Sequence, residues 1–71
     1  SVAFQIENMV GQKVEDIKQM LQDRGITPVL IQMEIPEDEE IEEGVVMRVE
    51  PQEGSWYVQE GSNTITLYYY E

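Results

Sequence analysis

The segment that most constrains the fold is an amphipathic stretch that begins near residue 14 and ends at a glycine. Its apolar side chains lie at Val14, Ile17 and Leu21, with Met20 beside them. This spacing places them on one side of an α-helix, which must pack that side against another element. Gly25 can adopt left-handed backbone angles, and Ile26 is placed to fold back onto Leu21 in a Schellman arrangement. The pattern predicts a helix from Val14 that ends before Gly25.

Four further segments have the alternating pattern of strands with one buried side. Residues 4–6 predict a short strand or an extended arm before the helix. After the helix, one strand is expected to carry its apolar side at Val29, Ile31, Met33 and Ile35. The next is expected to carry Val45, Met47 and Val49 on one side, with Val46 and Arg48 on the other. In the last, Thr64–Tyr70, the side facing the helix is expected to hold Ile65, Leu67 and Tyr69.

Turn residues separate these segments: Pro51 with Gly54, and later residues 61–63. The chain of 71 residues shows no internal repeat and no linker, so we expect one domain over residues 1–71, excised from a larger chain. The fold class predicted is α+β, a two-layer βαββ(β) module with one helix packed on a small three-stranded sheet.

The charge of the chain excludes two classes of partner. Fifteen Asp and Glu against four Lys and Arg give a formal net charge of -11, which repels phosphate backbones and anionic lipid surfaces. No apolar run reaches the ~20 residues that a membrane span needs. We therefore expect no nucleic-acid partner and no direct membrane insertion.

Six of the carboxylates lie within residues 37–43. Mutual repulsion favours an extended, solvated loop there. The alternating Asp or Asn pattern and central Gly of a calcium-binding loop are absent from this run. A solvated loop is thus favoured over a metal site, and we expect neither a metal nor a cofactor.

Ordinary catalytic pairs are missing from the composition. The chain has no His and no Cys, so a serine has no histidine base and there is no thiol nucleophile. Carboxylates could act as acid and base on a sugar only in a cleft that separates their environments, and the acidic run is not such a cleft. We expect a non-catalytic domain.

The candidate ligand-binding residues are aromatic side chains and one arginine: Arg48, Trp56, Tyr57, Tyr68 and Tyr70. Flat aromatic rings stack on sugars and hold peptides at a low entropic cost, and strand alternation puts Tyr68 and Tyr70 on the face away from the helix. Arg48 would offer a fork for a carboxylate. The alternative is structural: Trp56 and Tyr57 fill a gap under the turn, and the tyrosines only stabilise strand pairing.

The order of these motifs resembles that of the PASTA domain family. Residues 6–11, with Asn8 and Gly11, resemble the family's opening, and Leu21, Gly25 and Ile26 resemble the end of its helix. Three positions depart from the pattern. Glu7 stands where a proline is usual, Lys13 stands where a serine or threonine would cap the helix, a loss of about 1 kcal/mol, and Val49 replaces a residue that is usually polar. The stretch from Gly54 to Gly61 is also one residue longer than is usual in the family.

The second half of the chain carries the rest of the resemblance. The matching positions are Ile41, residues 44–47, Pro51, Gly54, Val58, residues 61–62 and residues 65–67. Together with the first half, the resemblance runs from about Ile6 to Tyr69, nearly the whole chain. The motifs are weak singly and specific in their order and spacing.

The resemblance implies a function that composition alone does not. It implies an extracellular, cell-wall-facing module of a membrane-anchored bacterial Ser/Thr kinase or penicillin-binding protein. Its expected partners are peptidoglycan fragments or the stem peptide, and neighbouring PASTA repeats. Two alternatives stay open: a structural spacer or protein-interaction domain in an extracellular stalk with no ligand of its own, and, on composition only, an intracellular acidic protein-binding module.

Overall fold

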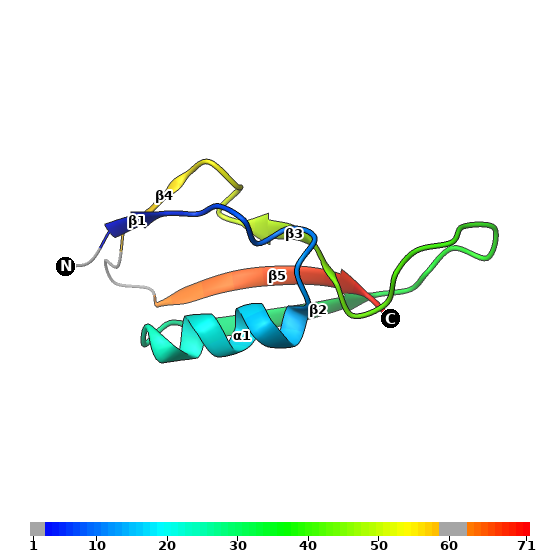
Figure 1. The fold of residues 1–71 in the computed structure, drawn as a ribbon, viewed down its shortest axis with the longest axis horizontal. Helices are drawn as coiled ribbons and strands as arrows, with labels where there is room; N and C mark the ends of the chain where they lie inside the picture. Colours follow the sequence, from blue (N-terminus) through cyan, green and yellow to red (C-terminus); the bar gives the residue numbers. More distant parts are fainter. Residues whose placement is uncertain (1–2, 59–62) are drawn as a thin grey trace.

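The structure is a computed structural model that describes residues 3–58 and 63–71. Its elements, in chain order, are β1 (Ala3–Gln5), α1 (Val14–Asp23), β2 (Thr27–Met33), β3 (Val46–Glu50), β4 (Trp56–Val58) and β5 (Thr64–Tyr70). One helix packs on a three-stranded sheet, so the α+β prediction is confirmed (Figure 1). The turn expected at residues 61–63 falls for the most part outside the described residues.

Helix α1 has the bounds and the buried side that its sequence pattern predicts. Val14, Ile17 and Leu21 are its buried residues, and Lys13 at the N-cap makes no capping bond with its side chain. At the other end Gly25 has a φ of +78°. The Ile26 amide donates to the Leu21 carbonyl at 2.9 Å and the Gly25 amide to the Gln22 carbonyl at 3.0 Å. These two bonds form the Schellman arrangement that ends the helix.

Strand β5 is the centre of the sheet, whose order is β2-β5-β3. It pairs with β2 in parallel and with β3 in antiparallel orientation. The parallel pairing is possible because the chain between β2 and β5 crosses over through the rest of the domain. Ile65 and Leu67 are fully buried and Tyr69 packs on the core, so the predicted inner side of β5 is confirmed.

A second, two-stranded ribbon joins β1 to β4 in antiparallel orientation. The sequence predicted β1 as a strand or arm, but it gave no indication of β4. Three residues are too few to show a periodic pattern. The pairing continues beyond the two strands, where the Ile6 amide donates to the Ser55 carbonyl at 2.8 Å and the Gly54 amide to the Ile6 carbonyl at 2.7 Å.

The core lies between the three-stranded sheet and a covering layer made of α1 and the β1–β4 ribbon (Figure 1). The helix contributes its apolar side, and the ribbon with its following turn contributes three more buried residues, Ile6, Met9 and Tyr57. From the sheet come Val46, Val49, Ile65 and Leu67. Both covering elements lie on the same face of the sheet, and the opposite face has no such layer among the described residues.

The inner side of β2 is the opposite of the expected one. Val29 and Ile31 are 40% and 38% exposed, whereas Leu30 packs against the core. The pairing with β5 explains this, because Leu30 stands beside Leu67 while Ile31 stands beside Tyr68. Since residues 29–31 are all apolar, hydrophobicity could not decide which side of this strand faces inward.

The prediction for the inner side of β3 is wrong at Val46 and Met47, because the pairing of this strand is irregular. The register with β5 shifts between Val46 and Arg48, which places Met47 in a β-bulge. Val46 and Val49 are both buried as a result, and Met47 is exposed. Simple alternation cannot put residues three apart on one side of a strand, but a bulge adds the extra residue that does.

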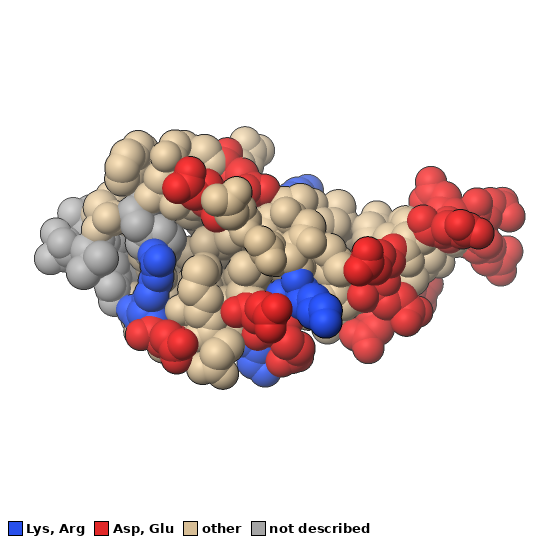
Figure 2. All heavy atoms as spheres, in the orientation of Figure 1, with Lys and Arg blue, Asp and Glu red and all other residues tan. Residues whose placement is uncertain are grey.

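Residues 36–43 form most of an acidic loop between β2 and β3 that projects from one end of the molecule (Figure 1). The acidic side chains of this loop are exposed, and Figure 2 shows them gathered at that end. The solvated loop predicted from the charge run is thus confirmed. At its base, the Gly44 amide donates to the Tyr70 carbonyl at 2.9 Å, which fastens the loop to the end of β5.

Matched substitutions on neighbouring strands test which face of the sheet is buried. Ile65→Val removes one methylene from a fully buried side chain and should lower the free energy of unfolding by about 0.5–1.5 kcal/mol. Ile31→Val makes the same change on the opposite face, and its free energy of unfolding should stay within about 0.5 kcal/mol of that of the parent. Urea unfolding followed by circular dichroism measures both. Equal losses at the two positions would contradict the assignment of faces.

The Schellman ending of α1 gives a second stability test. No heavy atom lies within 4 Å of the position that a Cβ at Gly25 would take, so Gly25→Ala meets only the backbone cost of a positive φ. The expected loss is about 1 kcal/mol, measured by thermal unfolding. Gly25→Asn is the matched control and should lose less, because Asn tolerates left-handed angles. If Gly25→Asn lowered the stability as much as Gly25→Ala, the positive φ would not explain the loss.

Candidate functional site

The candidate site is the face of the sheet that points away from α1, which we call the outer face. Its members follow from the pairing of β5, in which Thr66, Tyr68 and Tyr70 alternate with the buried residues. Beside them the outer face holds Val29, Ile31 and Met33 from β2 and Arg48 and Glu50 from β3. The face is therefore apolar and aromatic across two strands and carries one ion pair on the third.

Arg48 and Tyr68 are in direct contact on the outer face. They are direct partners in the antiparallel pairing of β3 with β5, and the guanidinium carbon of Arg48 lies 4.0 Å from the centroid of the Tyr68 ring. This distance allows a cation–π interaction. An Nη atom of Arg48 also lies 3.6 Å from a carboxylate oxygen of Glu50, and both side chains are half exposed. The two contacts hold the guanidinium against the sheet while its remaining N–H groups stay accessible.

The β-bulge at Met47 lets Val46 join Val49 in the core while Arg48 stays on the outer face. Without the register shift, Val46 and Val49 could not both reach the core with Arg48 on the other side. The bulge thus links the packing of the interior to the position of the cation outside. Bulges frequently aim a side chain in this way next to binding sites.

Chemically, the outer face combines two ways of holding a ligand. The ring of Tyr68, with Ile31 beside it, offers a flat apolar surface of the kind on which sugar rings and peptide backbones lie. Arg48 offers charged N–H donors that match a carboxylate. Tyr70 beside Met33 extends the surface toward the end of the sheet.

The five candidate residues predicted from the sequence fall into three environments. Arg48, Tyr68 and Tyr70 share the outer face. Tyr57 is only 5% exposed and lies in the core, and its hydroxyl donates to Asn63 Oδ1 at 3.5 Å. Trp56 is 65% exposed on the β1–β4 ribbon, where it pairs with Gln5. The structure therefore brings three of the five together and separates the other two from them.

Sequence reasoning missed the contribution of β2 to this face. Val29 and Ile31 were expected in the core, yet they stand beside Thr66 and Tyr68 on the outside. The signal that could have located them is the parallel pairing with β5, since partners in adjacent strands share a face. That pairing cannot be read from either strand alone.

Over residues 3–58 and 63–71, no group of three or more His, Cys, Asp or Glu residues is placed to hold a metal ion. The same part of the chain contains no helix that is long and apolar enough to cross a membrane.

Comparison with known proteins identifies the family. The family model described as PASTA domain matches residues 4–71. No curated protein and no solved structure gives a match. PASTA domains are non-catalytic binding domains known from kinases and penicillin-binding proteins, where they are typically extracellular. The match includes α1, the whole three-stranded sheet and all of the β1–β4 ribbon except Ala3, and the chain therefore belongs to the PASTA domain family.

Proposed function

We propose that this chain binds uncross-linked fragments of bacterial peptidoglycan on the outer face of its sheet. In this proposal it is an extracellular domain of a larger, membrane-anchored Ser/Thr kinase or penicillin-binding protein. In a kinase it would report the state of the wall, and in a penicillin-binding protein it would help to position the transpeptidase. The observation that carries the proposal is the Arg48 guanidinium stacked over Tyr68 on an uncovered apolar face.

A muropeptide offers chemistry that suits each part of this face. Its sugar rings present C–H surfaces to Tyr68 and Tyr70, while a carboxylate of its stem peptide pairs with Arg48. Glu50 already neutralises part of the Arg48 charge at 3.6 Å, so the ligand carboxylate competes with a side chain on the same strand. We therefore expect the stacked surface to supply much of the affinity and Arg48 to orient the fragment.

The net charge of the domain further limits the kinds of ligand that it can bind. With a net charge of -11, the domain repels polyanions at a distance, and the acidic loop adds to this at one end (Figure 2). Highly anionic wall polymers are therefore poor ligands. A sugar–peptide fragment with few charges meets less repulsion and needs only one cation to receive it.

The alternative function is a spacer in an extracellular stalk, with neighbouring PASTA repeats as its partners. The shape favours it, because the principal extents are 44 × 20 × 17 Å and β1 lies at the opposite end from the last residues of β5 (Figure 1). Self-repelling charge would also keep such domains apart. This alternative requires no ligand on the outer face.

Substitutions on the outer face distinguish a domain that binds peptidoglycan fragments from a spacer without a ligand. Arg48→Gln removes the guanidinium, and Tyr68→Val removes the ring while keeping a residue that favours strands. Each should weaken binding of a synthetic disaccharide-pentapeptide about tenfold, equivalent to about 1.4 kcal/mol. Isothermal titration calorimetry measures the affinities, and circular dichroism checks that the variants are folded.

Trp56→Val is the matched control for the loss of an aromatic ring. Trp56 is the most exposed aromatic residue described but lies on the ribbon, so its removal should leave the affinity unchanged. A loss at Trp56 with none at Tyr68 would move the site off the outer face. No heat of binding for the parent at millimolar fragment would support the spacer.

A further inference from the structure

The two edges of the three-stranded sheet differ in how they are protected. Strand β3, at one edge, has five residues, carries a bulge, and is partly covered by the chain before α1. There the Gly11 amide donates to the Val46 carbonyl at 2.8 Å, and the Val46 amide donates to the Gln12 carbonyl at 2.9 Å. Strand β2, at the other edge, pairs with β5 over all seven residues without a register shift and has no second neighbour among the described residues. One long and regular edge of the sheet is therefore open.

The open edge of β2 presents the backbone groups of Leu30 and Gln32. The Thr27 amide donates at 2.7 Å to the carbonyl just before β5, and the Met33 carbonyl accepts at 3.1 Å from the amide just after β5. The odd-numbered residues of β2 therefore direct their backbone groups toward β5, and the even-numbered residues direct theirs away from it. Within the described part of the chain, the backbone groups of Leu30 and Gln32 make no hydrogen bond. Pro28 adds only a carbonyl to this edge.

The composition of β2 gives this edge little protection against pairing. Edge strands usually carry charges, bulges or several prolines, which prevent them from joining another chain. Strand β2 has the sequence TPVLIQM, with no charged residue and one proline near its start. Its outer-face side chains Val29, Ile31 and Met33 are apolar, and the first two are 40% and 38% exposed. An apolar strand laid beside β2 would cover them.

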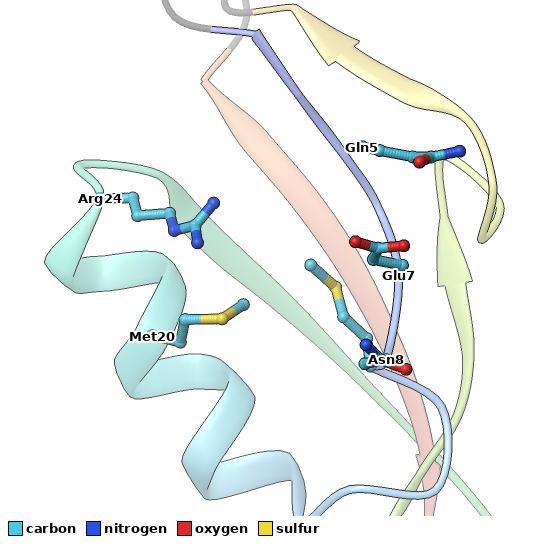
Figure 3. Close-up of a pocket in the computed structure, with 6 residues that line it drawn as sticks. Gln5, Glu7, Asn8, Met20 and Arg24 are labelled. Atoms are coloured by element: carbon cyan, nitrogen blue, oxygen red, sulfur yellow. The ribbon is translucent and has the colours of Figure 1, made fainter.

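The covering layer leaves space beside the open edge. Residues 24–26 alone separate α1 from β2, and Figure 1 shows the helix alongside the first part of the strand, which continues past it toward the acidic loop. Gln32, in the later part of β2, is exposed although its side chain lies on the same face of the sheet as the helix. On its other side α1 borders a cleft that separates it from the arm, with β5 running behind (Figure 3). The open edge of β2 is thus a surface separate from this cleft.

We propose that the open edge of β2 pairs with the same edge of a second copy of this chain, in antiparallel orientation about a two-fold axis at Ile31. In this register Leu30 of one copy and Gln32 of the other exchange both of their backbone hydrogen bonds, so every group of these two residues that is free in the monomer gains a partner. Val29 lies opposite Met33 of the other copy, and the two Ile31 side chains lie opposite each other. The product is a continuous six-stranded sheet, three strands from each copy.

A second copy is favoured as the occupant because the edge is complementary to itself. A two-fold axis presents the same donors and acceptors to each copy, and no charged residue of one β2 meets a charge of the other. Each α1 lies beside the first part of its own β2, so the axis at Ile31 sends the two helices toward opposite ends of the paired edge. The two acidic loops likewise project from opposite ends of the dimer, which keeps their charges apart (Figure 2).

Pairing at β2 leaves both outer faces open on the same side of the joined sheet. The inference therefore stands without any peptidoglycan ligand. Each copy has a net charge of -11, so long-range repulsion opposes the pairing and salt should strengthen it. The screening length falls from about 30 Å in 0.01 M salt to about 3 Å in 1 M salt.

Sedimentation equilibrium measures the association and its dependence on salt. The dissociation constant should be on the order of 1 mM in 1 M NaCl, because an edge of seven residues forms a small interface. In 0.01 M NaCl the association should be at least about tenfold weaker. A domain that is monomeric at about 2 mM in 1 M NaCl would overturn the proposal and leave the edge to another occupant, such as an extended peptide.

Transfer of saturation from water to backbone amides locates the interface by residue. The Leu30 and Gln32 amides are open to water in the monomer, and their transfer should fall by about half when the domain is concentrated to about 2 mM in 1 M NaCl. The Val29 and Ile31 amides bond to β5 and should show little transfer at any concentration. Glu40, in the acidic loop, should keep a constant signal. Unchanged transfer at Leu30 and Gln32 in a sample that does dimerise would place the interface elsewhere.

Single cysteines test the register, since the chain has no thiol of its own. In the proposed dimer the two Ile31 positions form a pair without backbone hydrogen bonds, whose Cα atoms lie about 4.5 Å apart, within the range of a disulfide. Val29 is the matched control on the same strand and face, and its two positions lie about 14 Å apart, four residues along the strand. Under oxidised glutathione, Ile31→Cys should form a disulfide-linked dimer at least about tenfold faster than Val29→Cys. Equal rates would contradict the register.

Substitution of Gln32 tests the role of the outward N–H group. Gln32→Pro removes this donor and places a ring on the edge, while the hydrogen bonds to β5 are kept because they come from the odd-numbered residues. It should weaken the association at least about tenfold, with the fold checked by circular dichroism. Gln32→Ala keeps the N–H group and should associate like the parent. An equal loss in Gln32→Ala, or no loss in a folded Gln32→Pro, would overturn pairing through the backbone of β2.

Discussion

The side chains of Ile65 and Leu67 lie between the sheet and its covering layer, and neither has any exposure to solvent. Both belong to β5, the strand that pairs with each of its neighbours. The helix and the β1–β4 ribbon must therefore both pack over β5 to keep these two side chains away from water. Among the described residues, one helix and one short ribbon serve this purpose, and both cover the same face.

The described residues leave the opposite face of the sheet uncovered. An exposed sheet face would ordinarily carry polar residues, but here it carries Ile31, Tyr68 and Tyr70 with Arg48 stacked over one of the rings. Large exposed apolar surfaces on small domains usually mark places of interaction. The sheet separates this flat, aromatic outer face from the side that carries the covering layer.

The parts of the fold that could be predicted are those whose signals lie within one segment. The spacing of Val14, Ile17 and Leu21 defines the helix, and Gly25 defines its end, without reference to any other strand. Alternation alone also gave the correct sides of β5. The inner sides of β2 and β3 could not be obtained this way, because one depends on pairing with β5 and the other on a bulge. For the same reason the sequence predicted Arg48, Tyr68 and Tyr70 for the candidate site, but it also included Tyr57, which is buried, and missed Ile31, which lies beside Tyr68.

If the proposed function is right, the peptidoglycan fragment binds to the outer face and not to the covered side of the sheet. The most direct measurement is a map of backbone amide shifts in the ¹⁵N-labelled domain during titration with a synthetic disaccharide-pentapeptide. We expect the shifted amides to cluster on β2, β3 and β5, around Ile31, Arg48 and Tyr68, and the amides in the middle of α1 to stay in place. Shifts concentrated on α1 or the β1–β4 ribbon, with the outer face unaffected, would contradict it.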